Sequence, residues 1–207
     1  MAIIAINRYY GSGGRVIGQK IAEKLGIPFY DKELLSIAAK DSGFTEALFE
    51  NADERPSNSL LYSIVTGNYN PRAWFFGGSD VLTNDTLFNI QAEVIRKVAE
   101  DGPCVIVGRC ADFILRERED LLRVFITAPL EKRMDFVRED SPELKTDKER
   151  ENFLRRMDKS RQSYYNYYTN RSWDALANYD LTINTGVIDD DSSVDLIIKA
   201  LELSGIK

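Results

Sequence analysis

A cluster of glycines near the start of the chain follows a short apolar run and precedes an amphipathic segment. Residues 2–6 read AIIAI, which is typical of a strand buried on both faces of a parallel sheet. The stretch YYGSGGRVIG, residues 9–18, holds the glycines, and a helix is expected from about Gly14 to Leu25. Such a loop suits phosphate binding, because curled backbone amides and a helix N-terminus both attract an anion.

The loop departs from the usual phosphate-binding pattern G-x-x-x-x-G-K-[ST]. Gly13 fits the second glycine of that pattern. Arg8 then stands at the first glycine, and Gly14 and Arg15 stand at the lysine and hydroxyl positions. A dinucleotide-binding turn, G-x-G-x-x-G, would instead need glycine at Val16. An ordinary strand-to-helix turn is the third interpretation that the glycines leave open.

Further apolar runs alternate with helical patterns along the chain. Strands are expected within residues 27–31, 103–108, 121–128 and 179–185. Helices are expected from about residue 84, from residue 146 and near the C-terminus. Thr146 and Glu149 have the spacing of a capping box. This alternation predicts an α/β fold with a parallel sheet covered on both faces.

Composition excludes several classes of function. The chain has no histidine, which rules out Ser-His-Asp catalysis and His-ligated zinc. Its net charge of −6 makes nucleic acid a poor partner. Two cysteines, Cys104 and Cys110, are too few for a disulfide scaffold, and no segment has the length of a membrane span. We expect a cytoplasmic protein without a membrane partner, and the oligomeric state stays open.

Five stretches, in their order and spacing, resemble the cytidylate kinase-like family. They are YYGSGGRVIGQKIAEKLGIPFYDKELL, VIVGRCADFIL, RVFITAPLEKRM, RMDKSRQSYYNYYTNRSWDALANYD and YDLTINTG. The resemblance implies a single P-loop NTPase domain, residues 1–207, with a three-layer α/β/α fold and a five-stranded parallel sheet. It also implies a helical monophosphate-binding insertion at about residues 32–83 and a helical lid at about residues 140–170.

The same resemblance implies a function and a set of site residues. ATP would donate its terminal phosphoryl group, with Mg²⁺, to a nucleoside monophosphate or another small acceptor. Donor phosphates would bind at Gly11, Ser12, Gly13, Gly14 and Arg15. Asp31 and Arg109 would lie near the acceptor. The lid would carry Arg155, Arg156 and Arg161, and the catalytic residues would be Arg15, Asp31, Arg155 and Arg161.

The chain differs from the family at two points. The family loop GSGKST aligns with GSGGRV, so Gly14 replaces the lysine, and Arg15 and Val16 replace the hydroxyl residues. The aspartate of the family's GRD turn is replaced by Cys110. We expect Arg15 to supply the missing cation, since a positive charge in the first turn of a helix is unfavourable without an anion. The alternative is a nucleotide-binding sensor or partner module without transfer activity.

Overall fold

The computed structural model describes residues 2–31 and 84–206. The elements are β1 (Ile3–Arg8), α1 (Gly14–Leu25), β2 (Phe29–Tyr30), α5 (Asn84–Asp101), β3 (Cys104–Val107), α6 (Ala111–Ile114), β4 (Leu121–Thr127), α7 (Leu130–Asp140), α8 (Asp147–Thr169), the 3₁₀ helix η2 (Leu176–Asn178), β5 (Leu181–Asn184) and α9 (Asp190–Ser204). The expected insertion at residues 32–83 lies outside the described residues.

The five strands form one parallel sheet in the order β2-β3-β1-β4-β5. Ile3 of β1 is in register with Cys104 of β3 on one side and with Leu121 of β4 on the other. β1 is therefore central, and its carboxyl end leads into the glycine-rich turn. The dinucleotide-binding order 3-2-1-4-5-6 places the second strand, not the third, beside the first. The topology therefore disagrees with the dinucleotide alternative.

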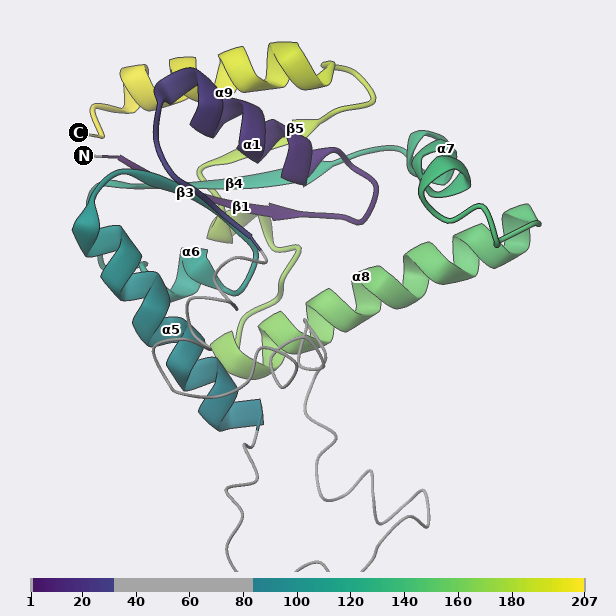
Figure 1. Cartoon of the computed structure of the whole chain (residues 1–207), viewed down its shortest axis with the longest axis horizontal. Coiled ribbons are helices and arrows are strands. Elements are labelled where there is room, and N and C mark those ends of the chain that lie inside the picture. The colour runs from purple at the N-terminus through teal and green to yellow at the C-terminus, as the bar shows by residue number, and fades with distance from the viewer. Residues whose placement is uncertain (1, 32–83, 207) are drawn as a thin grey trace, which may run out of the picture.

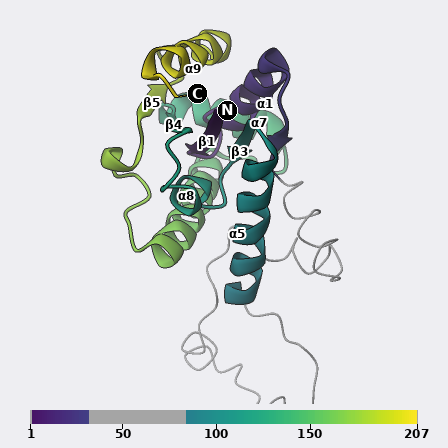
Figure 2. The same cartoon turned by 90° about the vertical axis from the view of Figure 1, so that its left-hand side faces the viewer.

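Helices cover both faces of the sheet, which confirms the three-layer prediction. α1 and α9 lie on one face, and α5, α6 and part of α8 lie on the other (Figures 1 and 2). The side chains of β1 alternate between the two layers: Ile3 and Ala5 join the cluster under α5, whereas Ile4 and Ile6 join the cluster under α1 and α9. A strand buried on both faces explains the continuous apolar run in the sequence.

Local signals define the ends of two important helices. Gly13 precedes α1 with φ +84°, and Gly26 follows it in the left-handed conformation. Thr146 and Glu149 form the predicted capping box at the start of α8. Helical spacing places Phe153, Met157, Ser160, Tyr164 and Tyr168 on one side of α8, and the buried positions of the helix differ partly from this stripe. They are Leu154, Tyr164, Tyr165 and Thr169, because the helix meets the core mainly through its C-terminal half.

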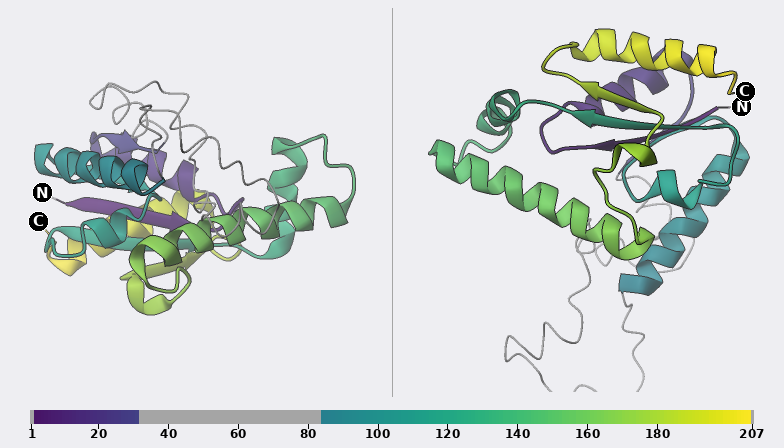
Figure 3. Two further views of the ribbon diagram at one scale, coloured as in Figure 1. Left: turned by 90° about the horizontal axis from the view of Figure 1, so that it is seen from below. Right: turned by 180° about the vertical axis from the view of Figure 1, so that it is seen from behind.

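α7 and α8 form a helical hairpin that extends past the carboxyl ends of the strands (Figures 1 and 3). α8 falls within residues 140–170, the region predicted as a lid, whereas α7 precedes that region and ends at Asp140. No helix in the described part of the chain combines the length and apolarity needed to cross a membrane.

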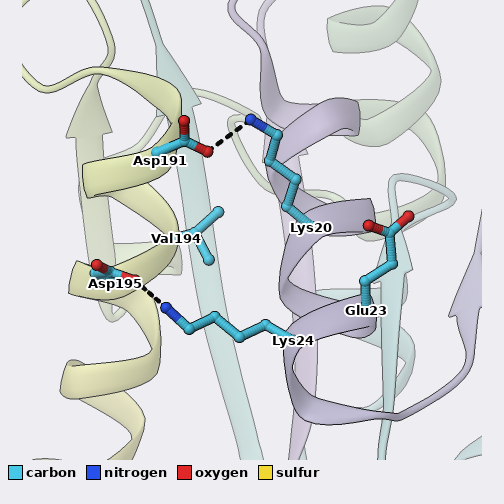
Figure 4. Close-up of a pocket in the computed structure, with 6 residues that line it drawn as sticks. All are labelled: Lys20, Glu23, Lys24, Asp191, Val194 and Asp195. Atoms are coloured by element: carbon cyan, nitrogen blue, oxygen red, sulfur yellow. Dashed lines mark hydrogen bonds and ion pairs between the residues drawn. The ribbon is translucent and has the colours of Figure 1, made fainter.

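Two ion pairs link α1 and α9 on the face of the sheet that lies opposite α5 and α6. Lys20 contacts Asp191 at 2.6 Å and Lys24 contacts Asp195 at 2.5 Å, on either side of Val194 (Figure 4). All four charged side chains are exposed, so solvent screens both pairs and they contribute little to stability. The residues drawn in Figure 4 line a shallow hollow between the two helices, which we interpret as a helix–helix contact. Lys24 serves as a control position in the test proposed below.

Candidate phosphate-binding site

The turn between β1 and α1, residues 9–14, is the glycine loop. Gly11 and Gly13 have φ values of +74° and +84°, which side chains rarely adopt. A Cβ on Gly11 would lie 3.1 Å from the carbonyl oxygen of Arg133, and one on Gly13 would lie 2.9 Å from a carboxylate oxygen of Asp190. The first turn of α1 carries no acidic residue. Backbone conformation and helix dipole therefore both favour an anion here.

Ser12 belongs to the frame of the loop. Its side chain is fully buried, and its hydroxyl lies 2.9 Å from the carbonyl oxygen of Tyr9 and 3.0 Å from that of Ile126, to which it donates. Thr185 in turn donates to the carbonyl oxygen of Ser12 at 2.9 Å. These bonds tie the loop to β4 and to the turn after β5. A hydroxyl that is buried against two carbonyl groups is poorly placed to bind Mg²⁺.

Arg15 and Asp31 form an ion pair beside the loop. The Nε of Arg15 donates to Asp31 at 2.7 Å; the Arg15 side chain is 59% exposed and that of Asp31 only 9%. Asp31 follows β2, which pairs in parallel with β3, so Asp31 and Arg109 follow neighbouring strands at the same edge of the sheet. The structure thus places both predicted acceptor residues at one edge, where Asp31 pairs with Arg15.

The described acidic residues beside the loop, Asp31 and Asp190, do not form a metal-binding cluster. Asp31 pairs with Arg15, and Asp190 lies 3.1 Å from Lys132. Within residues 2–31 and 84–206 no three acidic or sulfur ligands gather closely enough to hold a metal ion. Mg²⁺ commonly keeps several waters and binds through substrate phosphates plus one or two carboxylates. The described residues therefore fit a metal that arrives with its nucleotide better than one that the protein holds alone.

The turn after β3 has an unusual backbone. Gly108, Arg109 and Cys110 have φ values of +78°, +60° and +57°. Left-handed conformations at two consecutive non-glycine residues cost roughly 1–2 kcal/mol each. Such strain persists only where the surroundings fix it, and it gathers at functional sites. The turn holds Arg109 in a buried position, 3% exposed, directly beyond the carboxyl end of β3.

Three arginines from distant parts of the chain line one small cavity, here named the arginine cavity. Arg8 comes from the end of β1, Arg109 from the turn after β3 and Arg161 from α8. The remaining lining residues are Asn7, Cys110, Tyr164, Tyr165 and Trp173. Three of the eight described lining residues are arginines, a concentration of positive charge that favours an anion. Cys110 is buried beside the site, as expected.

A buried carboxyl group lies next to this cavity. Asp112 accepts a hydrogen bond from Nδ2 of Asn7 at 2.8 Å and one from the hydroxyl of Tyr165 at 2.6 Å. Burial raises the pKa of Asp112 above its ordinary value, while both hydrogen bonds lower it. The same burial raises the pKa of Tyr165. These contacts fix β1, α6 and α8 relative to one another around the arginines.

Tyr10 attaches the helical hairpin to the glycine loop. Its ring packs edge-on against Phe136 of α7 and Phe153 of α8. Its amide donates to Asp158 of α8 at 2.9 Å, and its carbonyl accepts from Nε of Arg133 at 2.7 Å. Arg133 and Asp158 also form an ion pair. Burial and a hydrogen bond to Asp140 raise the pKa of Tyr10 to about 12, so its hydroxyl stays protonated as a donor at neutral pH.

The predicted lid arginines separate into two groups. Arg161 lines the arginine cavity, and its Nη1 donates to the carbonyl oxygen of Arg8 at 3.1 Å. Arg155 is exposed and pairs with Glu151 one turn earlier. Arg155 and Arg156 face a different, open hollow on the hairpin. The structure therefore brings Arg109 and Arg161 together and leaves Arg155 and Arg156 apart from them.

Sequence reasoning missed several residues of this site, above all Arg8, Arg133 and Asp158. One signal for Arg8 was available, because it stands at the first glycine of the phosphate-binding pattern, where a side chain is unexpected. Nothing in the local sequence distinguishes Arg133 or Asp158 from other charged residues on solvated helices.

Comparisons with known proteins agree with this fold. The model of the cytidylate kinase-like family matches residues 3–187. An uncharacterized protein from Eubacterium ventriosum is 30% identical, with a TM-score of 0.71 and coverage of 98% of this chain and 99% of that one. Shikimate kinase from Bacteroides thetaiotaomicron is similar in fold, at 18% identity, a TM-score of 0.55 and coverage of 97% and 98%.

A second shikimate kinase, from Acinetobacter baumannii in complex with shikimate, has 15% identity, a TM-score of 0.53 and coverage of 100% of this chain and 96% of that one. No curated protein matches the chain. The match to the family model spans the glycine loop, the turn after β3 and the hairpin, and the fold is that of the P-loop kinases. The chain therefore belongs to the cytidylate kinase-like family.

Proposed function

We propose that the protein is a phosphotransferase that moves the terminal phosphoryl group of ATP to a nucleoside monophosphate or another small acceptor. The glycine loop would bind the donor phosphates, and Arg15 would contact them from the first turn of α1. Asp31 and Arg109 would bind the acceptor, and Arg155 and Arg161 would act from the hairpin. Mg²⁺ would neutralise phosphate charge when it enters with ATP. We place this activity in the cytoplasm, where the free thiols of Cys104 and Cys110 stay reduced.

One observation carries the proposal: the glycine loop and the arginine cavity lie side by side at the carboxyl ends of the central strands, since Arg8 both ends β1 and lines the cavity. Ligands of parallel α/β sheets bind at this edge. Phosphoryl transfer relies mainly on positioning and charge neutralisation, which amides and arginines supply without a histidine.

A specific observation also favours the second candidate, a nucleotide-binding module without transfer activity. Gly14 replaces the usual lysine, and the hydroxyl of Ser12 is buried against two carbonyl groups. Such a protein would bind the nucleotide and respond to it but would leave the phosphoryl group in place.

A paired experiment separates the two candidates. Calorimetry with a non-hydrolysable ATP analogue and Mg²⁺ measures binding, and a coupled ADP-release assay over nucleoside monophosphates, shikimate and gluconate measures transfer. Binding with acceptor-dependent ADP release supports the phosphotransferase. Binding without release from any acceptor favours the module, and absence of binding contradicts both.

Replacing Arg15 by alanine is expected to weaken binding of the ATP analogue about tenfold, which equals about 1.4 kcal/mol. The guanidinium is exposed and already paired with Asp31, so it contributes less than a buried cation would. Arg15→Lys should recover part of the loss, because a point charge cannot make a two-pronged contact. Calorimetry measures both variants; affinity unchanged in Arg15→Ala, with the circular dichroism spectrum intact, would assign the phosphate contact elsewhere.

The hairpin is expected to respond to the nucleotide. Residues 148–161 hold six basic and three acidic residues, so this part of α8 carries a local charge of +3. Closure over bound phosphates should slow amide hydrogen exchange in this segment once the ATP analogue is present. The C-terminal half of α8, buried at Tyr164 and Tyr165, serves as the internal reference. Equal exchange with and without saturating analogue would show that the hairpin is a static support.

A further inference from the structure

We propose that Arg8 supplies the cation that a lysine supplies in the usual phosphate loop, and that Arg8 and Arg161 bind a phosphoryl group of ATP beside Arg109 of the acceptor site. This inference rests on the proposed function. It differs from the sequence-based expectation, which assigned the cation to Arg15 alone.

The geometry of Gly14 is the first argument. A Cβ on Gly14 would lie 2.6 Å from Cβ of Arg8 and 3.1 Å from its Cγ. Rotating the far end of the arginine cannot relieve a contact with its first carbons. The stem of Arg8 therefore occupies the space in which any side chain at position 14 would begin. A side chain at position 14 and the arginine at position 8 therefore cannot both be present in this conformation of the loop.

The sequence shows the same exchange. The usual pattern has glycine at the position of Arg8 and lysine at the position of Gly14. Here the arginine stands at the first of these positions and the glycine at the second. One long cation is thus kept beside the loop, but it comes from the end of β1 instead of from the start of α1.

The surroundings of Arg8 are the second argument. Arg8 is buried and lines the arginine cavity with two other arginines, Arg109 and Arg161. Arginine binds phosphate oxygens through two parallel charge-assisted hydrogen bonds. The side chain of Arg15 is 59% exposed and so stays in contact with water. Of the two candidate cations, Arg8 is the one that a bound anion would meet in a desolvated position.

The small volume of the arginine cavity sets a condition for the binding of a phosphoryl group. Its volume of about 10 Å³ suits about one water molecule. A phosphoryl group is larger, so Arg161, which donates to the carbonyl oxygen of Arg8 at 3.1 Å, must shift when the anion enters. Arg161 belongs to α8, so binding in this cavity is coupled to movement of the hairpin.

The test measures the affinity for a non-hydrolysable ATP analogue with Mg²⁺ by calorimetry, together with the far-ultraviolet circular dichroism of each variant. Arg8→Ala is expected to lose roughly 30-fold in affinity, within the range for a charge-assisted hydrogen bond. Arg8→Lys should lose less. Lys24→Ala, which removes an exposed cation of α1, is the control and should bind like the wild type.

A second set of variants, which restores the usual phosphate-loop residues at positions 8 and 14, keeps the test decisive if Arg8→Ala folds poorly. Gly14→Lys alone should fail to improve binding, because the new side chain meets the stem of Arg8. Gly14→Lys in the Arg8→Gly background should bind about tenfold or more tighter than Arg8→Gly alone, because it restores the usual arrangement. If the wild type binds no triphosphate, the proposed function fails. If it binds and the Arg8 variants match Lys24→Ala, or the reversion brings no gain, this inference alone is wrong.

Discussion

Replacing Arg109 by alanine is expected to lower kcat/KM for the acceptor by roughly 150-fold, or about 3 kcal/mol, the upper end for a hydrogen bond to a charged group. The upper end applies because Arg109 is buried and held in a strained turn, so its contact with an anion is desolvated and preorganised. The affinity for the ATP analogue should fall less than that for the acceptor. Steady-state kinetics with each substrate varied in turn separates the two effects.

Two variants control for the backbone of this turn. Alanine is strained at the φ of +60° that Arg109 adopts, whereas asparagine tolerates the left-handed conformation. Arg109→Asn should therefore lose as much activity as Arg109→Ala while it keeps more stability. Arg116→Ala removes an exposed arginine that follows α6 and should leave kcat/KM unchanged. Equal loss of donor and acceptor affinity in Arg109→Asn would contradict the acceptor assignment.

The order of elements and the sheet could be predicted because their signals are local. Isoleucine-rich runs such as residues 2–6 indicate buried strands, and the spacing of Thr146 and Glu149 indicates where α8 begins. The resemblance to the family then supplied the five-stranded parallel sheet and the P-loop fold, which the structure and the comparisons confirm.

The composition of the site could be predicted only in part, because its contacts join residues far apart in the chain. Arg161 reaches Arg8 across 153 positions, and Asp158 reaches the amide of Tyr10 across 148. Neither pairing leaves a periodic pattern in the sequence. For Arg15 the sequence offered a local argument that it binds phosphate, since a cation at a helix N-terminus is unfavourable without an anion. In the structure Arg15 instead pairs with the carboxylate of Asp31.

The glycine loop depends on an aromatic cluster that sequence patterns do not reveal. Trp173 packs edge-on against Tyr9 at 5.4 Å and against Phe125 at 5.4 Å between ring centroids. Its carbonyl oxygen accepts a hydrogen bond from the hydroxyl of Tyr179 at 2.5 Å. Tyr9 is the first residue of the glycine loop and Phe125 belongs to β4, so Trp173 supports the loop from the segment that follows α8.

Trp173→Ala is therefore expected to lower the free energy of unfolding by about 3–5 kcal/mol, the cost of truncating a buried tryptophan. A loss of this size is a large share of the roughly 5–15 kcal/mol that stabilises an ordinary domain. Urea unfolding followed by circular dichroism measures it. Binding of the ATP analogue should also weaken, because Tyr9 loses its support.

Two control variants test whether the losses in Trp173→Ala come from the missing support of the loop and not from the removal of any aromatic side chain. Tyr167 lies on α8 with 57% of its surface exposed, so Tyr167→Ala should change the free energy of unfolding by less than about 0.5 kcal/mol. Trp173→Phe keeps an aromatic ring against Tyr9 and should retain most of the nucleotide affinity. If Trp173→Phe binds as weakly as Trp173→Ala, ring packing does not support the loop. If Trp173→Ala unfolds like the wild type, the cluster adds nothing to the core, and the coupling between core and phosphate site inferred from Tyr9 is wrong.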